Sequence, residues 1–81
     1  MLDMSTKVLI VEDDFEMNRL LALELKRHNY EVTTATNGLD GLRLFHEVRP
    51  DLVVLDVALP GMDGMTVCQR IRELSNVPIL I

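Results

Sequence analysis

One short segment constrains the fold of this chain more than any other: the apolar run Leu52-Val53-Val54-Leu55-Asp56-Val57. A run of branched apolar residues of this length is typical of a strand buried on both faces of a parallel sheet. One carboxylate, Asp56, interrupts it, and an ionised carboxylate is costly to bury without a partner. The turn-rich segment 58–64 follows, so we expect Asp56 at the carboxyl end of its strand. Open α/β sheets bind ligands at that end, which makes Asp56 a candidate functional residue.

Three further segments have the character of strands, and three stretches between them have the character of helices. Residues 7–11 and 77–81 are apolar runs, and residues 31–35 form a weaker one. Three helices are predicted between the strands: one from Asp13-Asp14 to His28, one from Asn37-Gly38 to Arg49, and one from about residues 63–66 to Ser75.

Apolar stripes at helical spacing support the three helices. They are Met17, Leu20, Leu21 and Leu25 in the first helix; Leu42, Phe45 and Val48 in the second; and Val67, Ile71 and Leu74, expected to be buried, in the third. Alternating strands and helices with right-handed crossovers predict an α/β fold, a doubly wound parallel sheet with helices on both faces. Because the chain is short for that class, we expect residues 1–81 to form one incomplete βαβαβαβ domain without a linker.

Composition narrows the class of protein. The chain has 81 residues, of which 48% are hydrophobic and 26% charged, as in ordinary soluble globular domains. The net charge of −5 argues against a nucleic-acid surface. No stretch approaches the roughly 18 apolar residues that predict a membrane span, and the N-terminus lacks the pattern of a signal peptide. A single cysteine, Cys68, offers no disulfide within the chain, so we expect a cytoplasmic protein.

Acidic residues follow two of the predicted strands. Glu12 and Asp13 come directly after residues 7–11, and Asp56 ends the run described above. If these strands are neighbours, the three carboxylates meet at one edge of the sheet and raise each other's pKa values. A divalent cation relieves that repulsion, and a hydrated site made of oxygen ligands suits Mg²⁺. Magnesium beside a strand-end aspartate is also what formation of an aspartyl-phosphate requires.

Each acidic residue also has a purely structural interpretation. Glu12, Asp13 and Asp14 can cap the helix that follows them, and we assign Asp14 to that role. Asp56 can be a solvated residue at a strand end, and Asp63 is better explained as a turn or cap residue than as a ligand. The combination of buried strands, an acidic pair and a strand-end aspartate favours the functional interpretation.

The chain resembles the receiver domain of two-component response regulators. The resemblance rests on residues 8–14, 51–56 and 59–64, and residues 35–38 and 77–79 also follow the family's usual course. It implies a flavodoxin-like sheet with strand order 2-1-3-4, which is 2-1-3-4-5 in a complete receiver.

The resemblance also implies roles for individual residues. Asp56 is the expected phosphoacceptor, receiving a phosphoryl group from the phosphohistidine of a sensor histidine kinase. Glu12 and Asp13 are expected to hold Mg²⁺ (or Mn²⁺) together with Asp56, and the backbone carbonyl of Ala58 to be a further ligand. The domain assists its own phosphorylation and is not expected to be an enzyme.

Receivers also have a Ser or Thr hydroxyl after the fourth strand and a Lys after the fifth, which contact the phosphoryl group. The sequence ends at Ile81, before those positions. We therefore expect a truncated receiver that accepts a phosphoryl group but does not switch. We also expect it to self-associate through its exposed fourth strand. An output domain is expected in the full-length protein, and contact with nucleic acid or membrane is not expected for this chain.

Other functions have weaker support. The same fold can serve as an interaction or assembly fragment that no longer signals. A phosphatase with an aspartate nucleophile needs a second aspartate two residues after Asp56, where this chain has Ala58, and no glycine-rich phosphate loop indicates a nucleotide-binding enzyme. His28, His46 and Cys68 are expected to be structural or exposed residues rather than ligands.

Overall fold

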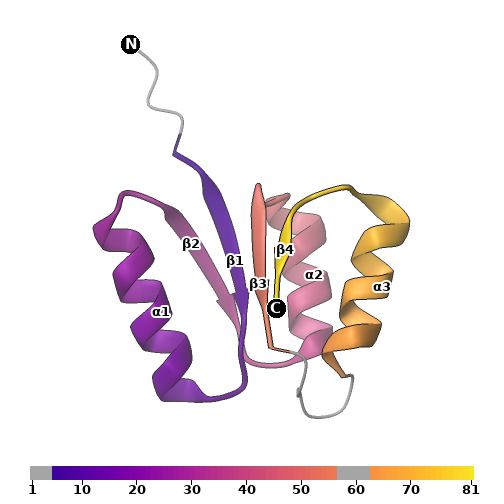
Figure 1. Cartoon of the computed structure of the whole chain (residues 1–81), viewed down its shortest axis with the longest axis horizontal. Coiled ribbons are helices and arrows are strands. Elements are labelled where there is room, and N and C mark those ends of the chain that lie inside the picture. Colours follow the sequence, from indigo (N-terminus) through magenta and orange to yellow (C-terminus); the bar gives the residue numbers. More distant parts are fainter. Residues whose placement is uncertain (1–4, 57–62) are drawn as a thin grey trace.

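The computed structural model describes residues 5–56 and 63–81 of the chain. Strands and helices alternate along it, as the sequence predicts (Figure 1). The elements are β1 (Lys7–Val11), α1 (Phe15–Arg27), β2 (Glu31–Ala35), α2 (Gly38–Val48), β3 (Leu52–Leu55), α3 (Gly64–Leu74) and β4 (Ile79–Leu80).

All four strands run parallel in one sheet of order β2-β1-β3-β4. Val11, the last residue of β1, pairs with Ala35 of β2 on one side and with Leu55 of β3 on the other. The carboxyl ends of these three strands are therefore level, at the lower edge of the sheet in Figure 1. The predicted flavodoxin-like sheet with order 2-1-3-4 is confirmed.

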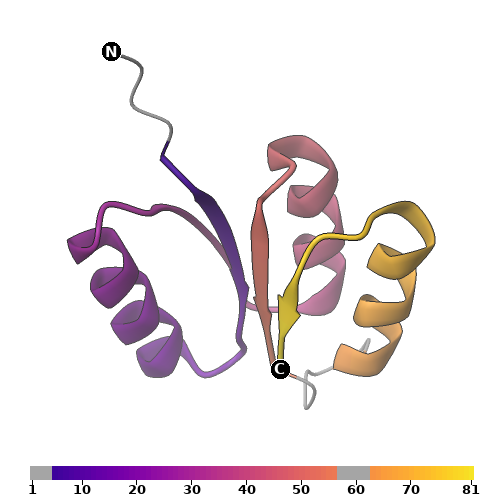
Figure 2. The same cartoon turned by 45° about the horizontal axis from the view of Figure 1, so that its top comes forward.

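Helices lie on both faces of the sheet (Figures 1 and 2). Side chains of β1 alternate between the two faces, since successive residues of a strand point to opposite sides. Leu9 and Val11 join the core formed with α2 and α3, whereas Val8 and Ile10 join a smaller core formed with α1. These four side chains are fully buried, so β1 is covered on both faces of the sheet.

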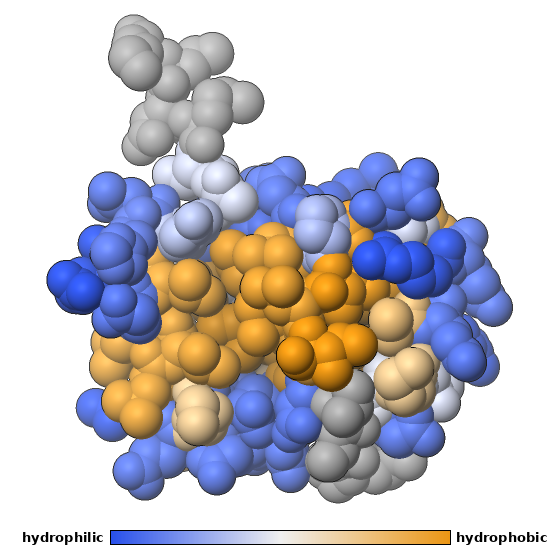
Figure 3. Space-filling view, in the orientation of Figure 1, coloured by the Kyte–Doolittle hydropathy of each residue, from blue (hydrophilic) through white to orange (hydrophobic). Residues whose placement is uncertain are grey.

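The face of the sheet that carries α1 is incompletely covered. Helix α1 packs on β1 and β2, and on this face Leu52 and Val54 of β3 are only half-buried. Leu80 of β4 and Ile81 are 58% and 71% exposed. Apolar residues accordingly gather across the middle of the surface in Figure 3. The expectation that the third strand is buried on both faces is wrong on this side, because α1 does not extend over β3.

Helix boundaries follow from local capping. The side chain of Asp14 accepts a hydrogen bond from the Met17 amide at 2.9 Å and begins α1, as predicted. Asn37 begins α2 by accepting from the Asp40 amide, also at 2.9 Å. Helix α2 ends at Val48, and the left-handed φ of 53° at its C-cap, Arg49, turns the chain before Pro50.

Three packing details differ from the sequence prediction. Leu74, expected in the core, is 64% exposed because it lies in the last turn of α3. Met17 and Leu20 of the predicted α1 stripe are also exposed, since α1 faces the sheet through Asn18, Leu21, Ala22 and Leu25. The fourth strand spans only two residues within the predicted range 77–81.

None of the helices in the described ranges has the length and apolar character of a membrane span.

Candidate functional site

Three carboxylates meet where β1 and β3 end. Glu12 and Asp13 follow β1 directly, and Asp56 follows β3 directly. The Asp56 amide donates to the Val11 carbonyl at 2.9 Å, which continues the pairing of β1 with β3 by one residue. One carboxylate oxygen from each of Glu12, Asp13 and Asp56 lies within 4.8 Å of the others. The convergence expected from the sequence is therefore present.

The cluster concentrates negative charge. Burial raises the pKa of Glu12 above its ordinary value of 4.5, and the neighbouring charge of Asp56 raises it further. A hydrogen bond from the Asp14 amide to Glu12 Oε2, at 3.0 Å, acts in the opposite direction. Glu12 and Asp56 are half-buried and Asp13 is exposed, so the site is open to water on one side.

This donor set fits a hard divalent cation. Three carboxylate oxygens supply the anionic ligands that Mg²⁺ or Mn²⁺ prefers, and the exposed side leaves room for the waters that Mg²⁺ retains. A bound cation would also offset the repulsion that raises the pKa of Glu12.

Behind the cluster lies a buried polar residue that the sequence pattern did not predict. Asn18 of α1 is 5% exposed, and its Nδ2 donates to the carbonyls of Glu12 and Ala35, each at 3.0 Å. The Glu12 amide donates to the same Ala35 carbonyl at 3.0 Å. A signal for this role exists in the sequence, because the polar Asn18 lies at helical spacing with the apolar Leu21, Ala22 and Leu25.

The acidic candidate Asp63 has a structural role. Asp63 begins α3 by accepting a hydrogen bond from the Thr66 amide at 2.8 Å. That bond lowers the pKa of the Asp63 carboxyl. The prediction of a cap residue is confirmed. Ala58, predicted as a backbone ligand, lies outside the described residues.

The smaller candidates do not contribute ligands to the cluster. His28 is exposed and pairs with Glu24 at 3.1 Å. The ring of His46 meets that of Phe45 edge to face, with centroids 5.7 Å apart. Cys68 is half-buried and packs against the larger core.

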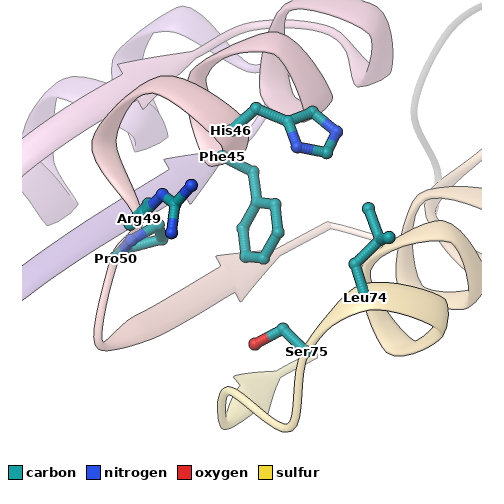
Figure 4. A pocket seen from close by; sticks show the side chains of 6 residues that line it. All are labelled: Phe45, His46, Arg49, Pro50, Leu74 and Ser75. Atoms are coloured by element: carbon teal, nitrogen blue, oxygen red, sulfur yellow. The ribbon is translucent and has the colours of Figure 1, made fainter.

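A cavity of about 340 Å³ lies between the ends of α2 and α3 (Figure 4). Its lining residues come from the end of α2, the turn before β3 and the end of α3; they are Phe45, His46, Arg49, Pro50, Leu74 and Ser75. Pro50 precedes β3, whereas Asp56 follows it, so this cavity lies at the opposite end of the strand from the carboxylates.

Comparison with solved structures places this geometry among known proteins. The BeF3-activated N-terminal receiver domain of Klebsiella pneumoniae RstA superposes with a TM-score of 0.87 and 39% identity, covering 91% of this chain and 63% of that one. The chemotaxis response regulator CheY4 of Vibrio cholerae superposes with a TM-score of 0.90 and 30% identity, covering 94% and 66%.

Comparison of sequences gives the same family. The transcriptional regulatory protein AfsQ1 of Streptomyces coelicolor is 50% identical over 74 residues, which are 91% of this chain and 33% of AfsQ1. The probable transcriptional regulator ycf27 of Guillardia theta is 44% identical over 80 residues, 99% of this chain and 32% of that protein. The chain thus spans about a third of these relatives. Residues 8–81 match the model of the response regulator receiver domain, and the chain belongs to that family.

Proposed function

We propose that this chain is the amino-terminal portion of a receiver that takes a phosphoryl group from a sensor histidine kinase onto Asp56. The observation that carries the proposal is the position of Asp56, half-buried at the carboxyl edge of the sheet with Glu12 and Asp13 within 4.8 Å. Receiver domains are in general phosphoacceptor signalling domains rather than enzymes. We extend that description to this chain.

The transfer is a substitution at phosphorus. A carboxylate oxygen of Asp56 forms a new P–O bond while the P–N bond to the kinase histidine breaks. The electron pair of that bond returns to the imidazole, which takes up a proton from water or solvent. Asp56 reacts as the carboxylate, so no base is needed to activate it.

Glu12, Asp13 and Asp56 would hold Mg²⁺ (or Mn²⁺), with the backbone carbonyl of Ala58 proposed as a further ligand by resemblance to the family. The cation supplies positive charge against the phosphoryl oxygens. The carboxylates of Glu12 and Asp13 fix where that charge lies relative to Asp56. Without it, three carboxylates would repel an incoming phosphoryl group.

Phosphorylation with acetyl phosphate tests the proposal directly. The 81-residue chain should gain the mass of one phosphoryl group in the presence of Mg²⁺, and Asp56→Asn should reduce the modified fraction by at least about 100-fold, since it removes the nucleophile. Asp63→Asn is the matched control, because Asn and Asp are equally good N-cap residues. Equal modification of Asp56→Asn and the unchanged chain would refute the assignment.

We further propose that phosphorylation of the 81-residue chain does not produce a conformational switch. Its two lysines are Lys7, at the amino end of β1, and Lys26, in the last turn of α1. Each lysine lies at the end of its strand or helix that is distant from Asp56. Neither can therefore pair with a phosphoryl group on Asp56. Amide NMR spectra with and without beryllofluoride should show changes confined to residues near Asp56; changes spread over the sheet and helices would contradict this.

The partners we propose follow from the family. AfsQ1 and ycf27 are named transcriptional regulators and are about three times as long as the matched segment. We propose that this receiver belongs to a longer protein with an output domain, and that the receiver segment, with a net charge of −5, does not itself contact nucleic acid. A cytoplasmic location follows from the proposed kinase, which needs ATP.

A second candidate function is that of an assembly fragment. The observation that favours it is the exposure at β4: Leu80 is 58% exposed, and Ile81, which follows the strand, is 71% exposed. An open strand edge offers unpaired backbone groups to another chain, so we propose self-association through β4. Binding of beryllofluoride distinguishes the receiver from the assembly fragment. Binding that requires Mg²⁺ and is lost in Asp56→Asn supports the receiver, because assembly through β4 does not require a phosphoryl site.

A further inference from the structure

Among the side chains that the structure describes, Asn18 is the one polar side chain in the buried class. It lies at the position of α1 that faces the ends of β1 and β2 rather than solvent. Burial of an amide is costly unless its hydrogen bonds are satisfied. An apolar residue would fill this position at lower cost if packing were its only role.

Both donors of the Asn18 amide are used on backbone carbonyls. Nδ2 lies 3.0 Å from the Glu12 oxygen and 3.0 Å from the Ala35 oxygen. Because both partners are acceptors, only the NH₂ end of the side chain can face them, which determines the orientation of the amide.

Of the two carbonyls that Asn18 contacts, that of Glu12 links Asn18 to the acidic cluster. Strand β1 ends at Val11, so this carbonyl is beyond the regular pairing of the sheet. It also belongs to the planar peptide group that joins Glu12 to Asp13. The amide of Glu12 is held separately, by the Ala35 carbonyl at 3.0 Å. Asn18 therefore fixes the rotation of the peptide group that lies between two of the three carboxylate residues.

We infer that Asn18 is a positioning residue for the metal site, acting through the Glu12–Asp13 peptide group without touching the ion. The inference rests on the proposed function, since Glu12 and Asp13 are its proposed ligands. Mg²⁺ tolerates little deviation from octahedral geometry, so a peptide group free to rotate would lower affinity for the ion. Residues that orient metal ligands typically change metal affinity by about 10–100-fold when they are removed.

The test compares two variants of the 81-residue chain with the unchanged protein. Asn18→Leu keeps a side chain of similar size and removes both donors. Ala22→Gly is the control, because Ala22 is buried on the same face of α1 one turn later and packs with the apolar Val8 and Ile10 of β1. Dissociation constants for Mn²⁺ are measured by electron paramagnetic resonance, and stability by thermal melts of the same samples.

Asn18→Leu should raise the Mn²⁺ dissociation constant by about tenfold, whereas Ala22→Gly should lower stability and leave the constant within about twofold. In phosphorylation by acetyl phosphate, Asn18→Leu should raise the half-saturating Mg²⁺ concentration by a similar factor and leave the rate at saturating Mg²⁺ nearly unchanged. If Asn18→Leu does not fold, the same measurements are made on Asn18→Ala, because this variant removes the amide without adding atoms.

The outcomes separate the two proposals. An unchanged Mn²⁺ constant in the folded Asn18 variant would overturn the positioning role and leave the proposed function intact. An equal loss of affinity in Ala22→Gly would also overturn it, since general loosening of α1 would then explain the effect. Failure of the unchanged chain to bind Mn²⁺ would overturn both proposals.

Discussion

The carboxylate of Glu12 shows, at the scale of one residue, how a candidate functional site lowers the stability of the fold. Burial and the charge of Asp56 raise its pKa above 4.5, so the folded chain holds that proton more tightly than the unfolded chain does. The free energy of folding therefore becomes less favourable as the pH rises from about the pKa of Glu12 in the unfolded chain through its raised pKa in the folded chain. Above the raised folded value the whole penalty is present unless a cation offsets it.

Glu12→Gln should remove that penalty. We expect the variant to be more stable than the unchanged chain at pH 7 without divalent ions, by less than about 1 kcal/mol because the site is partly solvated. The difference should shrink as the pH falls to about 4, where Glu12 becomes protonated in both states. Excess Mg²⁺ should reverse the order, since binding stabilises only the unchanged chain strongly. Thermal melts across this range provide the measurement.

Glu24→Gln is the control, because the pKa of Glu24 is shifted in the opposite direction to that of Glu12. Hydrogen bonds from Arg27 and His28 lower the pKa of Glu24 on the exposed surface of α1. Its contribution to stability is present above the unfolded pKa and is lost as the pH falls, so Glu24→Gln should not stabilise the chain at pH 7. Stabilisation by both variants would show that the Glu12 effect does not come from the acidic cluster.

At the scale of elements, the approach of α2 to the sheet depends on Gly41. A Cβ built at this position would lie 2.9 Å from Cγ2 and 3.0 Å from Cγ1 of Val11, the last residue of β1. Both contacts are too short for carbon atoms. Glycine here lets α2 pack close to the carboxyl end of β1, directly before Glu12.

Gly41→Ala should therefore destabilise the fold although alanine favours helices. Overpacking of a core typically costs about 1–3 kcal/mol, which exceeds the roughly 1 kcal/mol gained in helix propensity. Adding Val11→Ala removes the methyl groups that clash, so the double variant should lose less than the sum of the single changes. Urea unfolding of the four chains measures this coupling. Additive losses would show that Gly41 and Val11 do not compete for space.

At the scale of the whole molecule, the uneven cover of the sheet favours the self-association that we propose. Helices α2 and α3 cover one face, while on the other α1 leaves β3 and β4 partly exposed (Figures 1 and 3). Exposed apolar area beside an open strand edge favours contact with another chain. Charge on an edge strand opposes such pairing.

Leu80→Lys should weaken self-association of the 81-residue chain by about tenfold or more, because burying a leucine contributes about 1.5–3 kcal/mol. Leu74→Lys is the matched control, since Leu74 is exposed to a similar extent at the end of α3. Sedimentation velocity over a range of concentrations compares the variants. A monomer at all concentrations for the unchanged chain would contradict self-association through β4.

Much of this molecule was predictable from local sequence patterns. Short apolar runs and helical spacing predicted the parallel sheet, and Asp14 and Asp63 were identifiable as caps because capping depends on residues within one helical turn. The candidate ligands Glu12, Asp13 and Asp56 were predictable because parallel strands place their carboxyl ends at one edge.

Other features depended on contacts between segments far apart in the sequence. Asn18 reaches Ala35 across 17 positions, and the exposure of Leu52 and Val54 depends on how far α1 extends over the sheet. The sequence by itself determined which residues form the elements and which carboxylates could meet, since periodicity and capping act over a few residues. Only the tertiary structure decided which buried amide holds the Glu12–Asp13 peptide group and which sheet face stays open, because packing fixes both.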